Sequence, residues 1–207
     1  MGTALIGKQP ARHARRRGSD VSPAAEPLDD ALQRARAGDD SGFAELWRAL
    51  HPRLLRYLRV RTRGNHEDVA AETWLHAVRD LSSFDGNADG FRAWLFTLAR
   101  HRAIDAARAA AARPAVSVPD FSGVGRQPAA APAETEALDR ISTDRAIALV
   151  RRLPPDQADM VMLRVVAGLD VRVVAEIVGK SPGAVRVSVH RGLRALARDP
   201  KVRSEVV

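Results

Sequence analysis

The segment Asp170–Arg198 constrains the fold more than any other part of the chain. Apolar residues at positions i, i+3, i+4 and i+7 predict a short helix there, namely Val171, Val174, Ala175 and Val178. Gly179 ends this helix, because glycine accepts the left-handed conformation that a helix end needs. Ser181 suits the N-cap of a following helix, and Pro182 suits its first position, where no hydrogen bond is lost. We therefore predict two helices joined by a tight turn.

The second of these helices combines an apolar stripe with a basic face. We expect its buried stripe to be Val185, Val189, Leu193 and Leu196. Off that stripe lie Arg186, His190, Arg191, Arg194 and Arg198. Small residues at Ala175 and Gly179 let the two helices cross closely. The pattern favours a helix-turn-helix, whose second helix enters the DNA major groove, although a solvated helical hairpin remains the alternative.

The charge of the chain supports a nucleic-acid partner. The 207 residues carry a formal net charge of +8, which attracts polyanions. Among the basic residues only Lys8, Lys180 and Lys201 are lysine. Arginine makes bidentate contacts with phosphate and guanine, but a bias this strong also fits a GC-rich genome. The charge therefore supports DNA binding without specifying it.

Composition excludes several other classes. The chain has no cysteine, which rules out disulfides, thiolate zinc sites and cysteine nucleophiles. No apolar run approaches the roughly 18 residues of a membrane span, so we expect no membrane insertion. The N-terminus lacks the apolar core of a signal peptide, which predicts a cytoplasmic protein.

Catalytic motifs are missing as well. Glu72 and His76 stand at i and i+4 and could ligate a metal, but no HExxH arrangement surrounds them. No glycine-rich phosphate loop and no G-x-S-x-G sequence is present. We therefore expect a protein that is not an enzyme and holds no metal and no cofactor.

The order of the segments predicts two small helical domains joined by a flexible linker, in an all-α fold. Residues 1–27 mix arginine and proline without a period and read as a disordered basic tail, either an arm on DNA or an idle extension. Residues 114–134 have the Pro, Gly, Ala and Ser composition of a linker. The predicted domains are residues 28–113 and 135–199, and residues 200–207 form a short tail.

The first block is predicted to be helical throughout. A helix starts at Leu28, and a second apolar period follows after Gly38 and Ser41, with Pro52 bending its path. Asn65 can cap a third helix that ends near Leu81. We expect the apolar face of that third helix to be Ala71, Trp74, Leu75 and Val78.

A loop and a long helix complete this block. Residues 82–90 have loop composition, and the helix extends from Phe91 to about Ala112, buried through Phe91, Trp94, Leu95 and Leu98. Its polar face carries Thr97, His101, Asp105 and Arg108, flanked by Arg100 and Arg102. This face is either an ordinary solvated surface with an Asp105–Arg108 ion pair, or a phosphate-tracking surface beside a loop that can hold an unstacked base.

Three segments taken together resemble one protein family. These are EDVAAETWLHAVRDL (67–81), FRAWLFTLARHRAIDAAR (91–108) and ALVRRLPPDQADMVMLRVVAGLD (148–170), the last followed by the predicted helix-turn-helix. In this order they resemble the extracytoplasmic-function (ECF) sigma factors, small promoter-recognition subunits of bacterial RNA polymerase. The resemblance covers about Leu28 to Asp199, except most of the linker.

The resemblance implies roles for individual residues. The polymerase clamp would be bound by Asp68, Glu72 and Arg79. The −10 element would be read and melted by Phe84, Asp85, Asn87, Arg100, His101 and Arg108. The −35 element would be read by Ser181, Gly183, Arg186, Val187, His190 and Arg191. The linker would thread the polymerase near its RNA exit path, as in the family.

The chain departs from the family pattern at three places. Ala71 replaces a usual glutamine on the clamp-binding helix, and His101 replaces a usual asparagine. Val187 and Ser188 stand where the family often has serine and arginine. Valine cannot donate to a base but can contact a thymine methyl group. These departures affect which promoter sequence is preferred rather than the class of protein.

The resemblance thus implies an alternative sigma factor that binds core RNA polymerase and promoter DNA and is restrained by an anti-sigma factor. A stand-alone helix-turn-helix regulator remains the main alternative, since the second block alone would serve it. A hydrolase is a third and more remote reading, which a metal-dependence assay would reveal.

Overall fold

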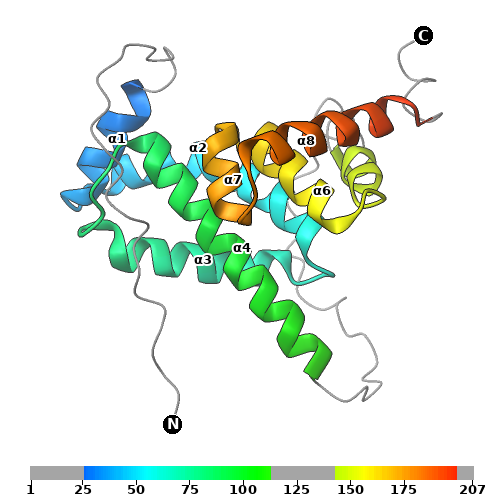
Figure 1. The fold of residues 1–207 in the computed structure, drawn as a ribbon. Coiled ribbons are helices and arrows are strands. Elements are labelled where there is room, and N and C mark those ends of the chain that lie inside the picture. The colour runs from blue at the N-terminus through cyan, green and yellow to red at the C-terminus, as the bar shows by residue number, and fades with distance from the viewer. Residues whose placement is uncertain (1–25, 113–142, 200–207) are drawn as a thin grey trace, which may run out of the picture.

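The structure is a computed structural model that describes residues 26–112 and 143–199, and all regular elements in these residues are helical (Figure 1). The first region contains α1 (Glu26–Arg36), α2 (Asp40–Arg61), α3 (His66–Leu81) and α4 (Ala88–Ala112). The second region contains helical residues 143–150, α6 (Pro155–Val161), the π-helical turn η1 (Met162–Val166), α7 (Val171–Val178) and α8 (Pro182–Ala197). The predicted all-α fold with two helical regions is confirmed. Most of the predicted N-terminal tail, the linker and the C-terminal tail lie outside the described residues.

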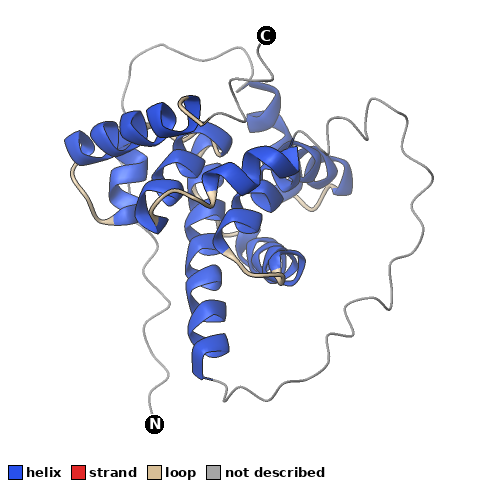
Figure 2. Cartoon of the chain, turned by 90° about the vertical axis from the view of Figure 1, so that its right-hand side faces the viewer, coloured by secondary structure: helices blue, strands red, loops and turns tan. Residues whose placement is uncertain are grey.

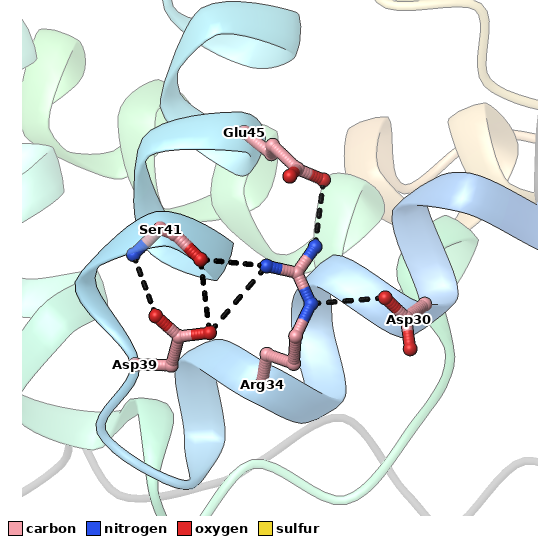
Figure 3. A network of polar contacts seen from close by, with 5 residues as sticks. All are labelled: Asp30, Arg34, Asp39, Ser41 and Glu45. Carbon is pink, nitrogen blue, oxygen red and sulfur yellow. Dashed lines mark hydrogen bonds and ion pairs between the residues drawn. The ribbon is translucent and has the colours of Figure 1, made fainter.

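A polar cluster fixes the corner between α1 and α2 (Figure 3). The Arg34 guanidinium contacts carboxylates of Asp30 at 2.9 Å and Glu45 at 2.8 Å. Asp39 caps α2 by accepting from the Ser41 backbone N–H at 2.8 Å and also from the Ser41 hydroxyl. These hydrogen bonds, assisted by Arg34, lower the pKa of the Asp39 carboxyl. The predicted break near Gly38 and Ser41 is therefore confirmed, although α1 begins two residues before Leu28.

The helix α2 passes through Pro52 without interruption and forms the centre of the first region. Its fully buried side chains recur at helical spacing: Leu46, Leu50, Leu54, Tyr57 and Leu58. The predicted apolar period is confirmed for this helix.

The buried face of α3 differs from the predicted one. Leu75 is 72% exposed and Val78 is 49% exposed, and Ala71 is exposed as well. Of the predicted face only Trp74 is buried, and the actual face is Val69, Ala70, Thr73, Trp74, Ala77 and Leu81. Thr73 tolerates burial because its hydroxyl donates to the Val69 carbonyl at 2.7 Å. The helix carries two apolar stripes, and only packing against α2 and α4 selects between them.

The helix α4 begins at Ala88, three residues before the predicted start, so the loop is shorter than expected. The Ala88 N–H donates to the Asp29 carboxylate of α1 at 2.5 Å, and the Gly90 N–H donates to the Asn87 side chain at 2.9 Å. These two side chains satisfy N–H groups that the first helical turn cannot pair internally. Both views show α4 extending beyond its neighbours at its C-terminal end (Figure 2).

The interior of α4 was predicted only in part. Phe91 and Leu95 are buried as expected, but Trp94 and Leu98 are only half-buried. Phe96 is fully buried because it packs edge-on against Tyr57 at a ring-centroid distance of 5.5 Å. The sequence does not predict this burial.

The helix-turn-helix forms as predicted. Asp170 caps α7, Gly179 ends it with φ of 67°, and the Ser181 hydroxyl accepts from the Ala184 N–H at 3.2 Å to cap α8. The prediction that Leu193 is buried was wrong, since it is 43% exposed. Gly192 is buried instead, because α8 crosses α6 so closely that a Cβ at this position would lie 2.7 Å from Val161.

The two regions pack against each other. Residues of both belong to one hydrophobic core, in which α2 lies against α6 and η1. Tyr57 of α2 hydrogen-bonds across this boundary to Asp159 of α6. The linker composition predicts independent domains, and only the folded structure reveals this docking.

Candidate nucleic-acid interface

The exposed face of α8 gathers the residues predicted to read the −35 element. These residues are all exposed: Ser181, Gly183, Arg186, Val187, His190 and Arg191. The face begins at the capped N-terminus of α8, where backbone N–H groups also favour anions. Gly183 leaves this turn open, since a Cβ there would meet only the Ser181 hydroxyl oxygen at 4.0 Å. Folding therefore brings all six residues to one surface.

The charge on this face is available for binding. Within the described residues no ion pair engages Arg186, Arg191 or Arg194. Val187 lies among them with 50% of its surface exposed. An exposed row of guanidinium groups with one apolar contact point matches what major-groove recognition requires.

The loop between α3 and α4 is built around Phe84. The Phe84 ring packs against Phe91 and Trp94, each at a centroid distance of 5.5 Å. Asp85 and Asn87 are exposed on the outside of the loop. Phe84 thus supports the loop from within, while the exposed polar residues are the ones that could contact a nucleotide.

The polar face of α4 is divided. His101 is exposed, and Arg108 is exposed at 3.7 Å from Asp105, so the i,i+3 pair of the solvated-surface alternative is present. Arg100 is different, because its Nε donates to the buried Asp159 carboxylate at 2.9 Å. The structure therefore does not bring Arg100 to the same open surface as His101 and Arg108.

The residues predicted to bind polymerase share one exposed face of α3. Asp68, Glu72 and Arg79 are all exposed, and Leu75 lies between them at the same helical spacing. The sequence predicts Leu75 in the core because Ala71, Trp74, Leu75 and Val78 recur at helical spacing. The place of Leu75 in the series 68, 72, 75 and 79 was the signal that would have put it on the outer face. The result is an apolar centre with charged residues around it.

His76 links α3 to α4. Arg79 contacts Nε2 of its ring, and Arg102 of α4 lies 2.6 Å from Nδ1. Burial, Arg79 and Arg102 together lower the pKa of His76. The two guanidinium groups oppose a bound cation here, and the described residues contain no cluster of three metal-ligating side chains.

Within the same residues no helix has the length and apolar character needed to cross a bilayer.

Comparison with known proteins places both regions in one family. Residues 46–113 match the Sigma-70 region 2 family, and residues 143–196 match Sigma-70, region 4. The ECF RNA polymerase sigma factor SigD of Mycobacterium tuberculosis is 34% identical over 190 residues, which cover 86% of this chain and 87% of SigD. BldN, an ECF sigma factor of Streptomyces coelicolor, is 33% identical over 172 residues, covering 81% of this chain and 63% of BldN.

Solved structures agree on the fold. CnrH, solved in complex with the cytosolic domain of CnrY, has a TM-score of 0.56 at 20% identity, covering 83% of this chain and 95% of CnrH. The sigma factor RpoE of Bartonella quintana, solved with the anti-sigma factor NepR, has a TM-score of 0.54 at 24% identity, covering 74% of this chain and 93% of RpoE. The chain therefore belongs to the ECF sigma factors, the alternative sigma factors that direct promoter-specific transcription by RNA polymerase and are initiation factors rather than enzymes.

Proposed function

We propose that this chain binds core RNA polymerase through the outer face of α3 and reads promoter DNA through α8, α4 and the loop before α4. The observation that carries the proposal is that one chain presents two chemically different exposed faces. The α3 face is apolar and charged, as a protein-binding surface is, and the α8 face is basic, as a DNA-binding surface is.

The polymerase-binding residues in this proposal are Asp68, Glu72 and Arg79, with Leu75 at the centre. Leu75 contributes to binding because its apolar surface is removed from water, whereas the charged side chains around it set the orientation of the polymerase. Val78 lies at the edge of the same face and is 49% exposed. Two large apolar side chains on one exposed helix face are a surface that a protein partner would cover.

Recognition of the −35 element is assigned to the exposed face of α8. Arg186 and Arg191 would each donate two hydrogen bonds to a guanine edge or a phosphate. Val187 would contact a thymine methyl group. Ser181 and Gly183 sit at the first turn, where backbone N–H groups can meet a phosphate, and His190 lies beside the arginines.

Recognition and melting of the −10 element are assigned to Asp85 and Asn87 in the loop, held by Phe84, and to Arg100, His101 and Arg108 on α4, of which Arg100 is bound to Asp159 in this structure. Unstacking a base costs a few kcal/mol, which contacts to the extruded nucleotide must recover. The imidazole of His101 can stack on a base or exchange hydrogen bonds with it. This assignment rests on the exposure of Asp85, Asn87, His101 and Arg108 and on the order of the whole set along the family's pattern.

An anti-sigma factor is the further partner we propose. The apolar centre of the α3 face would suit such an inhibitor as well as the polymerase, so that binding one excludes the other. The structural relative RpoE was solved with the anti-sigma factor NepR. The identity of the anti-sigma factor that binds this chain is determined by residues of the anti-sigma factor itself.

The test is competition for core polymerase by the variant Glu72→Arg. Reversing one charge at an interface costs up to several kcal/mol, so the variant should lose binding to core polymerase while its helicity stays intact. Glu67→Arg is the graded comparison, since it reverses the same charge on the same helix in line with Val78, at the edge of the face, and should weaken binding less than Glu72→Arg. Equal binding by Glu72→Arg and wild type would refute the assignment of this face.

Run-off transcription with core polymerase on a genomic fragment library would then identify the promoter. A stand-alone helix-turn-helix regulator would bind DNA without retaining core polymerase during purification. Retention of the polymerase together with promoter-specific transcripts supports the sigma-factor assignment of this chain.

A further inference from the structure

Asp159 is a buried carboxylate at the boundary between the two helical regions. Asp159 is 3% exposed and lies on α6 of the second region. The Tyr57 hydroxyl donates to Oδ1 at 2.8 Å, and Arg100 Nε donates to Oδ2 at 2.9 Å. Arg61 Nε lies 3.6 Å from Oδ1. All three partners belong to the first region, so one carboxylate of the second region is bound by α2 and α4 together.

Further polar contacts cross the same boundary between the two regions. Arg59 of α2 pairs with Asp144 at 2.7 Å, and Arg151 donates to the carbonyls of Arg59 and Thr62, to the latter at 3.1 Å. Each contact joins the C-terminal half of α2, or the residue after it, to the second region. The docked arrangement is thus specified by directed hydrogen bonds as well as by apolar packing.

A buried carboxylate with these partners favours one arrangement strongly. Taking a charge out of water is costly, and only well-placed hydrogen bonds and opposite charges offset that cost. Sliding or rotating the second region would leave Asp159 and Arg100 both without partners. Buried ionic groups act through specificity in some proteins, and the partners of Asp159 would penalise other arrangements of the two regions in the same way.

The docked arrangement conflicts with reading a promoter. A pocket of about 310 Å³ is lined both by Asp89 and Arg92 at the start of α4 and by Asp170 at the start of the helix-turn-helix. The −10 and −35 elements are centred ~25 base pairs apart, or about 85 Å along B-form DNA at about 3.4 Å per base pair. Two regions that share one pocket cannot span that distance.

Arg100 connects this docking to DNA binding. It belongs to the polar face of α4, next to His101, but its guanidinium is occupied by Asp159. A carboxylate and a phosphate both offer anionic oxygens to a guanidinium. Asp159 therefore occupies the group that a −10 phosphate would otherwise engage.

We propose that Asp159 is an autoinhibitory lock, which docks the helix-turn-helix region on α4 and occupies Arg100 until the two regions separate. The DNA consequence rests on the proposed function, whereas the docking itself does not. Free chains are then mostly closed, and their apparent affinity for DNA is reduced by the small fraction that is open. Breaking the lock should raise that fraction.

The test compares Asp159→Asn with wild type in the full chain. The variant keeps the shape of the side chain but removes its charge, so Arg100 and Arg61 lose their anionic partner. Small-angle X-ray scattering should show a larger radius of gyration. Fluorescence anisotropy with a labelled single-stranded DNA oligonucleotide of random sequence should show about tenfold tighter binding.

Three further variants make the result specific. Asp30→Asn changes charge equally but breaks only the contact with Arg34, so it should match wild type in both measurements. Tyr57→Phe removes one hydrogen bond of the lock and keeps both charges, so it should open the chain less than Asp159→Asn. Adding Arg100→Gln to Asp159→Asn should cancel the gain in DNA affinity while leaving the chain open.

Each outcome decides the proposal. A folded Asp159→Asn that scatters as compactly as wild type overturns the lock, and an open variant without tighter DNA binding overturns the autoinhibition. If circular dichroism shows that Asp159→Asn is unfolded, Tyr57→Phe decides in its place, and its identity to wild type in both measurements overturns the proposal. Failure to bind core polymerase would refute the proposed function alone, since scattering reports the docking independently.

Discussion

The helices α4 and α8 both carry arginines toward expected DNA, but they hold them differently. The arginines of α8 project into solvent, and no ion pair within the described residues engages Arg186 or Arg191. On α4, Arg100 is bound to a buried carboxylate, and Arg92 pairs with Asp89 at 2.6 Å. A guanidinium without an ion pair in the folded chain can form its ion pair with a ligand. A guanidinium that is already paired stabilises the fold instead, and that pair must break before it binds a ligand. The same residue type thus has opposite primary roles on the two helices.

The largest effect of this difference between α4 and α8 should appear in the free energy of unfolding of arginine variants. Arg100→Ala leaves Asp159 buried with weaker partners and should lower the free energy of unfolding by about 2–3 kcal/mol, less than for a fully buried pair because Arg100 is partly exposed. Arg186→Ala removes only an exposed side chain and should change it by under about 0.5 kcal/mol. Urea unfolding followed by circular dichroism measures both. Equal losses would show that the two arginines do not differ in role.

The two faces of α8 should differ in the same way. Gly192→Ala places a Cβ 2.7 Å from Val161 and 3.1 Å from Gln157, so it should destabilise the fold by about 1–3 kcal/mol. Gly183→Ala adds a methyl group in open space and improves helix propensity, so the fold should gain up to about 1 kcal/mol. Thermal unfolding of the two variants side by side checks this. A stable Gly192→Ala would mean that α6 and α8 separate easily.

Arg186 and Arg191, whose removal should hardly change stability, should matter for DNA binding. Arg186→Ala and Arg191→Ala should each weaken −35 binding by about 1–3 kcal/mol and relax preference at particular base pairs if they contact guanine edges. Val187→Ser should reduce discrimination for thymine at one position. Binding titrations across mutated sites at several salt concentrations separate these effects. Uniform weakening with a flatter salt slope would identify phosphate contacts instead.

On α4 the exposed residue His101 should matter for melting rather than for stability. His101→Ala should impair transcription from duplex promoters more than from templates with a pre-opened −10 bubble, because the cost of unstacking is already met there. His101→Asn should retain activity and shift the preferred −10 base. Both variants should bind core polymerase normally. Wild-type activity of His101→Ala on duplex promoters at limiting enzyme would contradict this role.

The smallest effect concerns the contact between α3 and α4 at His76. Burial, Arg79 and Arg102 lower the pKa of His76, so the folded chain binds its proton less readily than the unfolded chain does. This group therefore stabilises the fold less as pH falls below its ordinary value of about 6.5, and the loss ends once pH is below the folded pKa. Burial also lowers the pKa of His51, which adds to the same trend. His76→Gln should lose less stability between pH 7 and pH 5 than wild type, as urea unfolding at the two pH values would measure.

Local signals in the sequence determined where helices begin and end in the second region. Asp170, Gly179, Ser181 and Pro182 act on backbone groups within three residues of themselves, so their effect is written in the adjacent sequence. The order of segments likewise determined the family. In the first region, the start of α4 was misplaced because the local cap Asn87 was included in the loop and the second cap, Asp29, lies 59 residues away from Ala88.

Only the tertiary structure decided which faces are buried and which charges are free. The apolar stripe containing Leu75 and the stripe containing Val69 and Trp74 fit the same helix, and packing on α2 chose the second. Leu193 is half exposed because Gly192 is what lets α8 approach α6. Arg100 is paired because Asp159 is brought to it across 59 residues, as Tyr57 is across 102. Periodicity states that a helix has an apolar side, but the partner that covers that side is set by contacts far apart in the chain.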